Sequence, residues 1–362
     1  MFLQAETQFG LNFLNTLPVH NESLVFSPVS IALVLSLVHT GARGRSKEQI
    51  GDVLLRGASD DQYVNHFSFI SENIRKGENG VETHVANRVY LRKGFTANPS
   101  FLSVALKNYG ADAKTLDFDG LTAAREVNTF VKEATKGKIT EVVTKDTLKD
   151  AVALLINAIY FKGHWQDEFD GYSIADHDFT TYSGFVKKMK FMKESMWHRE
   201  YSSDDVFQVL HLKYTDPRFL FSVFLPKEQN TLTQALAKLD AKRFQTLVKN
   251  HNRTLMNVEM PKFAVEKEVD LKRSSERMGI TDIFSDRANL SGLAENIKIS
   301  DGVHKAIIEV TEIGTTAAAV TSAKAVPYSL PMGTPVDFKA NHPFLFSLTF
   351  LGHPIFMGVL NE

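Results

Sequence analysis

The sequence predicts an α+β fold, and two observations support that prediction. Amphipathic helical patterns dominate the first third of the chain, whereas short β-branched and aromatic runs dominate the second half. Between them, residues 151–161 are apolar on both faces, as expected of a central strand that is covered on both sides. Helices early in the chain and antiparallel-type strands later are typical of α+β proteins.

The expected helices have recognisable ends. The first helical pattern ends at Pro18, and Ser27-Pro28 then forms an N-cap followed by proline at the first helical position. Ser46 with Gln49 resembles a capping box for a short third helix. Further helices are expected over residues 60–74, from 98 onward, and over 121–136, 232–249 and 271–278.

The expected strands lie mostly in the second half. Their patterns are bounded by turn residues and are rich in Val, Ile and Phe. Besides the central strand, they cover residues 81–91, 206–214, 219–225, 255–263, 303–310, 344–351 and 355–360.

Composition excludes several classes of function. The formal net charge of −1 over 362 residues favours neither nucleic acid nor an anionic membrane as a partner. Cysteine is absent, which removes disulfides, thiol catalysis and cysteine metal sites. The first residues become polar too soon for a signal-peptide core, and no run could span a bilayer. We therefore expect a cytoplasmic protein, with secretion by an unconventional route left open.

Catalytic motifs are missing from the sequence. It contains no Gly-x-Ser-x-Gly elbow, no His-Glu-x-x-His and no glycine-rich phosphate loop. The adjacent carboxylates Asp167 and Glu168 are more typical of a solvated turn than of an acid–base pair. We predict that the protein is not an enzyme, and no cofactor or metal is implied.

Residues 309–335 have an unusual composition. A strand end is followed by the small residues of 314–319, then by a mixed segment and a proline-flanked Pro327-Tyr-Ser-Leu-Pro331. Nothing in this stretch prevents it from lying outside as a loop or inside as a strand.

Six segments, taken in order, give the chain a family resemblance. They are Phe26-Ser-Pro-Val-Ser-Ile-Ala, Asn157-Ala-Ile-Tyr-Phe-Lys-Gly-His-Trp, Val258-Glu-Met-Pro-Lys-Phe, Gly302-Val-His-Lys-Ala-Ile-Ile, Glu312-Ile-Gly-Thr-Thr-Ala-Ala-Ala and Asn341-His-Pro-Phe-Leu-Phe. Together they resemble the serpins over essentially the whole length of the chain. In character the chain is closest to the intracellular ovalbumin-like serpins, which lack a cleavable signal peptide.

The resemblance implies a fold and a mechanism. The family fold has three β-sheets and about nine helices in one domain, here residues 1–362, with an exposed C-terminal reactive-centre loop at about 312–335. Inhibitory members act as suicide substrates: a serine protease cleaves the loop, which then inserts into the main sheet while the protease stays attached. The alternatives are a non-inhibitory carrier, chaperone or storage serpin, and a cross-class inhibitor of papain-like cysteine proteases.

The residues of the hinge are compatible with insertion. Alternate residues of a strand face one side, and the set that begins at Thr315 is small and uncharged, with no charge before Lys324. As a strand, residues 314–328 would span about 46 Å, close to the width of about 50 Å expected for a compact domain of this size. The hinge residues are Glu312, Gly314, Thr315, Thr316, Ala317, Ala318, Ala319 and Thr321.

Matching the hinge to the family places the reactive bond at Tyr328-Ser329. Val326, Pro327 and Leu330 flank it and would contribute to specificity. An aromatic residue before the cleaved bond suits the hydrophobic primary pocket of chymotrypsin-like proteases.

Other residues correspond to the family's sheet-opening sites. A polar cluster beneath the sheet and an aromatic residue at its top are matched by position, together with an exposed ion pair of Lys262 and Glu312. The matched residues are Ser27, Ser30, Asn157, His304, Trp165 and Lys262.

The sequence also departs from the family pattern. Ile313 and Thr316 stand where the family often has acidic residues, and we expect neither to face the buried side. The helix that corresponds to the family's glycosaminoglycan site has only Arg75 and Lys76 as basic residues. The expected partner is therefore a chymotrypsin-like serine protease, without heparin activation, acting on a monomeric inhibitor.

Overall fold

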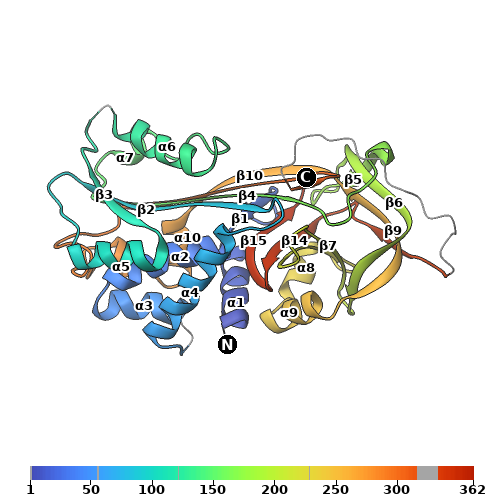
Figure 1. The fold of residues 1–362 in the computed structure, drawn as a ribbon, viewed down its shortest axis with the longest axis horizontal. Helices are drawn as coiled ribbons and strands as arrows, with labels where there is room; N and C mark the ends of the chain where they lie inside the picture. The colour runs from blue at the N-terminus through green and yellow to red at the C-terminus, as the bar shows by residue number, and fades with distance from the viewer. Residues whose placement is uncertain (1, 55–56, 121, 228, 316–332) are drawn as a thin grey trace.

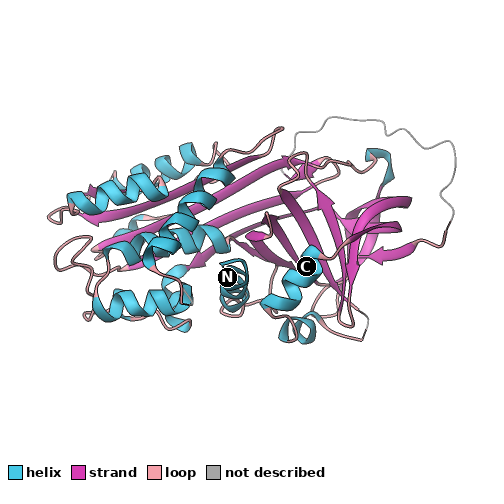
Figure 2. Cartoon of the chain, turned by 60° about the horizontal axis from the view of Figure 1, so that its bottom comes forward, coloured by secondary structure: helices cyan, strands magenta, loops and turns pink. Residues whose placement is uncertain are grey.

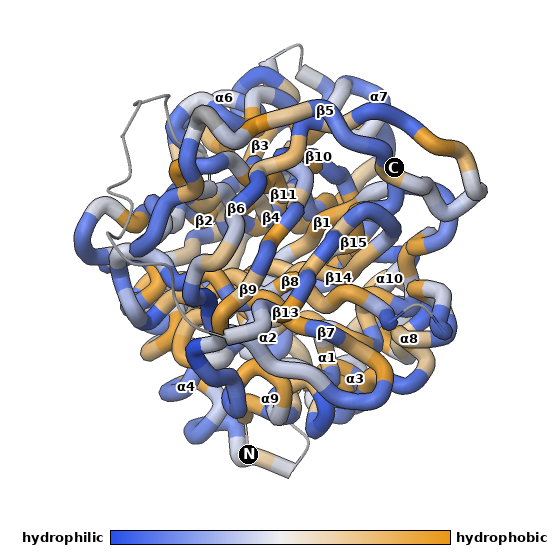
Figure 3. The backbone as a smooth tube through the Cα atoms, turned by 90° about the vertical axis from the view of Figure 1, so that its right-hand side faces the viewer, coloured by the Kyte–Doolittle hydropathy of each residue, from blue (hydrophilic) through white to orange (hydrophobic). Residues whose placement is uncertain are grey.

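The computed structural model describes residues 2–54, 57–120, 122–227, 229–315 and 333–362 (Figure 1). A long six-stranded sheet runs through the molecule, and most helices cover it at one end. A nine-stranded sheet fills the other end (Figure 2). In Figure 3 the hydrophobic segments gather at the centre, around β8 (Phe219–Pro226) and β14 (Phe344–Phe350).

Ten α-helices lie within the described residues. They are α1 (Phe2–Leu14), α2 (Pro28–Gly41), α3 (Gly44–Leu54), α4 (Asp60–Arg75), α5 (Pro99–Tyr109), α6 (Ala123–Ala134), α7 (Lys145–Leu148), α8 (Leu232–Ala237), α9 (Ala241–Lys249) and α10 (Leu271–Arg277). In this part of the chain, no helix is long and apolar enough to cross a membrane. The cap of α2 is the predicted one, since the Ser27 side chain accepts a hydrogen bond from Ser30 N.

Two helix predictions are wrong in detail. The pattern over 232–249 forms two helices, because the Asp240 side chain accepts a hydrogen bond from Arg243 N and starts α9 there. Ser46 does not cap α3. That helix begins at Gly44, and the Ser46 hydroxyl accepts from Asn289 N instead (3.0 Å).

The six-stranded sheet has the order β10-β11-β12-β4-β2-β3. Its strands are β10 (Phe263–Asp270), β11 (Asp301–Val310), β12 (Gly314–Thr315), β4 (Ala153–His164), β2 (Glu82–Arg92) and β3 (Asp112–Leu116). Leu155 and Ile159 of β4 join the main core, whereas Leu154 and Ile156 pack into a second core with α6. This central strand is covered on both faces, as the sequence predicts.

The nine-stranded sheet has the order β1-β15-β14-β8-β7-β6-β9-β13, and β5 pairs with β6. The strands not yet defined are β1 (Leu24–Phe26), β5 (Ile174–Thr180), β6 (Val186–Ser203), β7 (Phe207–Lys213), β9 (Asn252–Pro261), β13 (Val336–Lys339) and β15 (His353–Leu360). The long β6 pairs with β5 at its start and with β7 at its end. It therefore joins two smaller groups of strands into one continuous sheet. The three expected sheets therefore appear as two continuous ones.

Candidate functional site

The chain leaves β11 and at once re-enters the same sheet as β12. Within β12, Thr315 pairs with Val310 of β11 and with Gly163 of β4, antiparallel to both. Below this point β11 and β4 pair directly and in parallel, from Asp301↔Leu154 to Ile307↔Tyr160. β11 and β4 therefore pair directly over most of their length. They are separated only next to Val310 and Gly163, where β12 lies between them, and this end is called the top of the sheet.

A tight turn brings β12 into this position. The main-chain N–H and the hydroxyl of Thr311 both donate to the carbonyl oxygen of Gly314, at 2.8 and 2.9 Å. Gly314 lies so close to β4 that a Cβ would sit 2.1 Å from the carbonyl oxygen of Gly163. Only glycine fits here.

Thr315 is fully buried, on the core side of the sheet. Its hydroxyl shares a hydrogen bond of 2.5 Å with the hydroxyl of Tyr214. Burial raises the pKa of Tyr214 well above its ordinary value, so this phenol stays neutral. Tyr214 was not identified from the sequence, since its only signal there is an aromatic residue at the end of a strand.

Trp165 holds the turn from below. Its indole N–H donates to the carbonyl oxygen of Thr311 (2.8 Å), and its main-chain N–H donates to that of Ile313 (2.9 Å). The indole packs on the Tyr214 ring, with 4.6 Å between centroids. Ile313 is only 4% exposed, so the prediction that it avoids the buried side is wrong. The reason is the turn, which breaks the strand alternation before Gly314.

Lys262 and Glu312 form the expected ion pair, at 2.5 Å. The Lys262 and Glu312 side chains are 29% and 17% exposed, so the pair is partly buried and not exposed as predicted. The carbonyl oxygen of Glu312 also accepts from Phe169 N (2.9 Å), which fixes the start of the turn.

A buried polar cluster lies further down, where β11 and β4 meet. His304 and Asn157 are paired across the two strands, and a hydrogen bond joins His304 Nδ1 to Asn157 Oδ1. The other ring nitrogen, Nε2, accepts from Ser27 N (3.0 Å), so the ring proton is on Nδ1. Burial lowers the pKa of His304 to about 3, which keeps the ring neutral.

The Asn157 amide connects this cluster to α2 and β2. Its nitrogen donates to the Ser30 hydroxyl (2.6 Å) and also contacts Asn87 Oδ1. Asn87 is a further member that the sequence reasoning missed, although a polar residue within the apolar pattern of 81–91 was an available signal.

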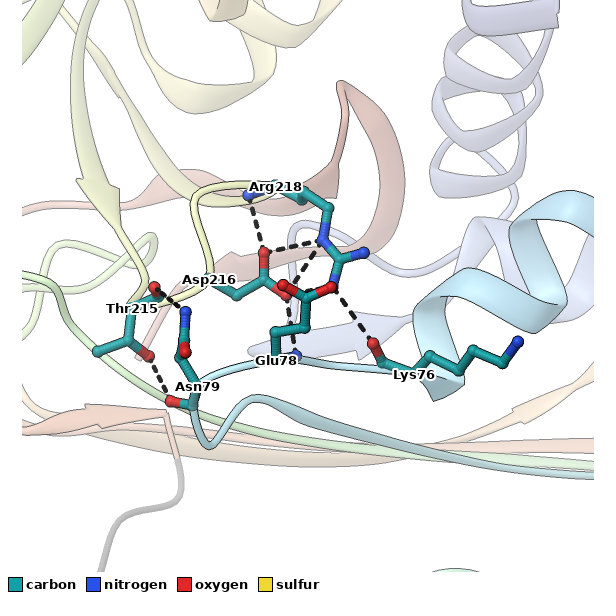
Figure 4. Close-up of polar contacts among 6 residues, drawn as sticks. All are labelled: Lys76, Glu78, Asn79, Thr215, Asp216 and Arg218. Carbon is teal, nitrogen blue, oxygen red and sulfur yellow. Dashed lines mark hydrogen bonds and ion pairs between the residues drawn. The ribbon is translucent and has the colours of Figure 1, made fainter.

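A second polar group fixes the turn after Tyr214 (Figure 4). Asp216 is fully buried; its carboxylate accepts from the Arg218 guanidinium (2.6 and 2.9 Å) and from Glu78 N (3.1 Å). Arg218 also donates to the carbonyl oxygen of Lys76 (3.2 Å), at the end of α4. Burial alone would raise the pKa of Asp216, but these hydrogen bonds and the positive charge of Arg218 hold it below its usual value. The segment after α4 is therefore tied to the turn that follows Tyr214, between β7 and β8.

The comparisons with known proteins agree with this geometry. A family model described as "Serpin (serine protease inhibitor)" matches residues 4–362. The chain belongs to the serpin family. A leukocyte elastase inhibitor of Xenopus laevis is 34% identical over 336 residues, covering 90% of this chain and 88% of the relative. Antichymotrypsin-2 of Bombyx mori is 32% identical over 352 residues, covering 94% of this chain and 92% of the relative.

The serpin fold predicted from the sequence is confirmed. The thermophilic serpin tengpin in its native state superimposes with a TM-score of 0.93 at 26% identity, covering 100% of this chain and 94% of that one.

Part of the predicted serpin site lies outside the described residues. These positions are Thr316, Ala317, Ala318, Ala319, Thr321, Val326, Pro327, Tyr328, Ser329 and Leu330. The described residues bring together the rest of the hinge (Glu312, Gly314 and Thr315) with Trp165 and Lys262 at the top of the sheet. They place Ser27, Ser30, Asn157 and His304 in one separate cluster below.

Proposed function

We propose that this serpin is a suicide-substrate inhibitor of chymotrypsin-like serine proteases and not an enzyme. Cleavage at Tyr328-Ser329 would release residues 316–328 to follow β12 into the sheet. The observation that carries the proposal is the position of β12 itself. Gly314 and Thr315 already lie between β11 and β4, antiparallel to both, as the first residues of an inserted strand must.

The register of β12 defines the path of the remaining hinge. Because the pairing is antiparallel, each further residue of the loop would pair with a residue one position earlier on both β11 and β4. Ala317 would then lie between Ile308 and Phe161, whose side chains belong to the main core. Because these neighbours are large, a small residue is the one that fits, and the next inward residue, Ala319, is small as well.

The same register brings Thr321 to the level of His304 and Asn157. An inserted strand would separate these two residues and break the hydrogen bond between them. The Thr321 hydroxyl both donates and accepts, so it could replace the lost partner of each one. An apolar residue there would leave two buried polar groups unsatisfied, at about 1–3 kcal/mol each.

Insertion exchanges one ladder for two. The parallel pairing of β11 with β4, from Asp301↔Leu154 to Ile307↔Tyr160, would be lost, and antiparallel pairing would form on both sides of the new strand. Parallel pairing is slightly less stable per residue than antiparallel pairing. The main-chain hydrogen bonds formed should outnumber those lost by about a dozen. At about 1 kcal/mol each, insertion would release on the order of 10 kcal/mol.

The choice of protease rests on Tyr328. A tyrosine before the cleaved bond fits a hydrophobic primary pocket and not one that holds a buried aspartate. The names of two relatives, an antichymotrypsin and a leukocyte elastase inhibitor, support serine proteases as the targets. Cytoplasmic location and a monomeric state remain predictions, which cell fractionation and size-exclusion chromatography would check.

Incubation of the full chain with chymotrypsin tests the proposal. The expected products are a complex that survives denaturant at the combined mass and a released peptide that begins at Ser329. Papain in a parallel incubation tests cross-class inhibition. Complete cleavage by chymotrypsin with no complex would exclude the inhibitory reading and favour a non-inhibitory serpin.

A further inference from the structure

Three side chains from distant parts of the sequence meet where α1, α4 and the start of β15 come together. They are Glu6 of α1, His66 of α4 and His353, the first residue of β15. The Glu6 oxygen Oε1 lies 2.6 Å from His66 Nε2, and Oε2 contacts His353 Nδ1. The serpin mechanism proposed above uses none of them.

We propose that Glu6, His66 and His353 form a binding site for a divalent transition-metal ion, best suited to zinc. Two imidazole nitrogens and one carboxylate oxygen are one of the three-ligand sets that open zinc sites use, with water in the fourth position. The three ligand atoms all lie within 4.8 Å of one another. Around a tetrahedral zinc ion such atoms are about 3.3 Å apart. Side-chain movements that change these separations by up to about 1.5 Å would therefore form the site.

The surroundings hold the ligands in place. Gln245 of α9 donates to the Thr7 hydroxyl (2.6 Å), beside Glu6, and to the carbonyl oxygen of Gly352 (3.0 Å), beside His353. The Phe2 ring stacks on His66 with 4.2 Å between centroids. These contacts fix the chain beside Glu6 and His353 and hold the His66 ring, so the three ligands need little rearrangement to bind an ion.

An ion can reach the site from solvent. The Glu6 side chain is buried, at 6% exposed, but those of His66 and His353 are 13% and 15% exposed. Water could therefore complete the coordination. Magnesium and calcium prefer sites built from oxygen atoms, so the two imidazoles select against them.

Calorimetric titration of the chelator-treated full chain with zinc chloride tests the site. We expect one zinc ion per chain and no heat with magnesium. His66→Gln and His353→Gln should each weaken binding by more than about tenfold, the smallest loss expected even for an outer partner of a ligand. His84→Gln is the matched control, because His84 forms a surface pair with a single carboxylate, Glu82 (2.9 Å), and should bind zinc as the wild type does.

Cobalt gives a readout that does not depend on stability. The wild type should develop the visible absorption of four-coordinate Co²⁺, and Glu6→Gln, which keeps the side-chain shape, should lose it. Thermal melts without metal would show that each variant is folded. No binding by the wild type, or equal binding by the wild type and the folded His353→Gln variant, would overturn the proposal.

Discussion

At the scale of single residues, the face of the inserted strand is set at Thr315. The side chain is buried against Tyr214, so an arginine there would carry an unpaired charge into the core at a cost of several kcal/mol. Thr315→Arg should therefore convert the inhibitor into a substrate, cleaved by chymotrypsin without a stable complex.

Thr316→Arg is the matched control for that substitution. In the proposed register, residue 316 would face the opposite side, level with Lys162 and Glu309, where a charge can be solvated. This variant should still form the complex on a denaturing gel. If Thr315→Arg also forms it, the register that begins at β12 is wrong.

His304 gives a pH-dependent term in stability. Its pKa is about 3 in the folded protein, where burial keeps the ring neutral, and close to 6.5 when the chain is unfolded. Between these values only the unfolded state binds the proton, so the free energy of unfolding falls as the pH falls, by about 1.4 kcal/mol per pH unit.

His304→Gln should remove this term. Urea unfolding followed from about pH 6 down to about pH 4.5 should show a slope smaller by about 1.4 kcal/mol per pH unit than in the wild type. An identical slope in both proteins would mean that His304 is not buried in its neutral form.

Sequence patterns could predict some of these residues and not others. Trp165, Lys262, Asn157 and His304 stand within short segments that resemble the family, so their places in the sheet could be predicted by position. Tyr214 acts on Thr315 through a contact between residues 101 positions apart, which no local pattern encodes.

At the scale of elements, β12 is a strand of two residues, and its position in the sheet depends on Gly314. A Cβ on Gly314 would meet the main chain of β4 at 2.1 Å and 2.8 Å, and backbone atoms cannot move aside as a side chain can. Gly314→Ala should expel β12 from the top of the sheet.

The expected readout is the fluorescence of Trp165, which the turn covers. In a Trp197→Phe background, Gly314→Ala should shift the emission to longer wavelength as the indole meets water, and it should raise the fraction of inhibitor that is cleaved as substrate. Gly171→Ala is the control, since an added Cβ there meets nothing within 4 Å. An unchanged emission would show that β12 tolerates the methyl group.

The hydrogen-bonded group of Asp216, Arg218 and Glu78, called the Asp216 clamp, joins the turn after β7 to the segment after α4. Asp216→Asn keeps the shape but removes the charge that Arg218 and Glu78 N contact, which should lower the free energy of unfolding by about 1–3 kcal/mol. Asp286→Asn, in a carboxylate 93% exposed, should leave the urea midpoint unchanged. Equal midpoints for both variants would argue against a structural role for the clamp.

The elements differ in how well sequence patterns predict them. Most of the capped helices and the longer buried strands were predicted because local chemistry fixes them, whereas the short α7 and β1 were not. β1, β3, β5, β6, β10 and β13 were not among the predicted strands. At the β5–β6 hairpin the reason is that Lys187, Lys188 and Lys190 interrupt the apolar pattern on a largely exposed segment. Strand direction was also beyond reach: β11 pairs with β4 in parallel, as β2 does with β3, because tertiary connections decide it.

At the scale of the whole molecule, the described fold is the uninserted state, because β11 and β4 still pair directly. If insertion releases on the order of 10 kcal/mol, cutting the loop should raise the melting temperature by roughly 10 °C or more for a chain of this length. Calorimetry before and after limited proteolysis within 316–332 would measure it, and an unchanged melting temperature would argue against insertion.

The two-residue strand β12 also limits self-association of the protein. A sheet that can accept a strand is open to the same segment of a neighbouring molecule. Here the entrance is occupied by the chain's own Gly314 and Thr315, at an effective concentration that no neighbour can match. Linear polymers should therefore grow only as fast as β12 leaves the sheet. The Gly314→Ala variant should polymerise on mild heating before the wild type does.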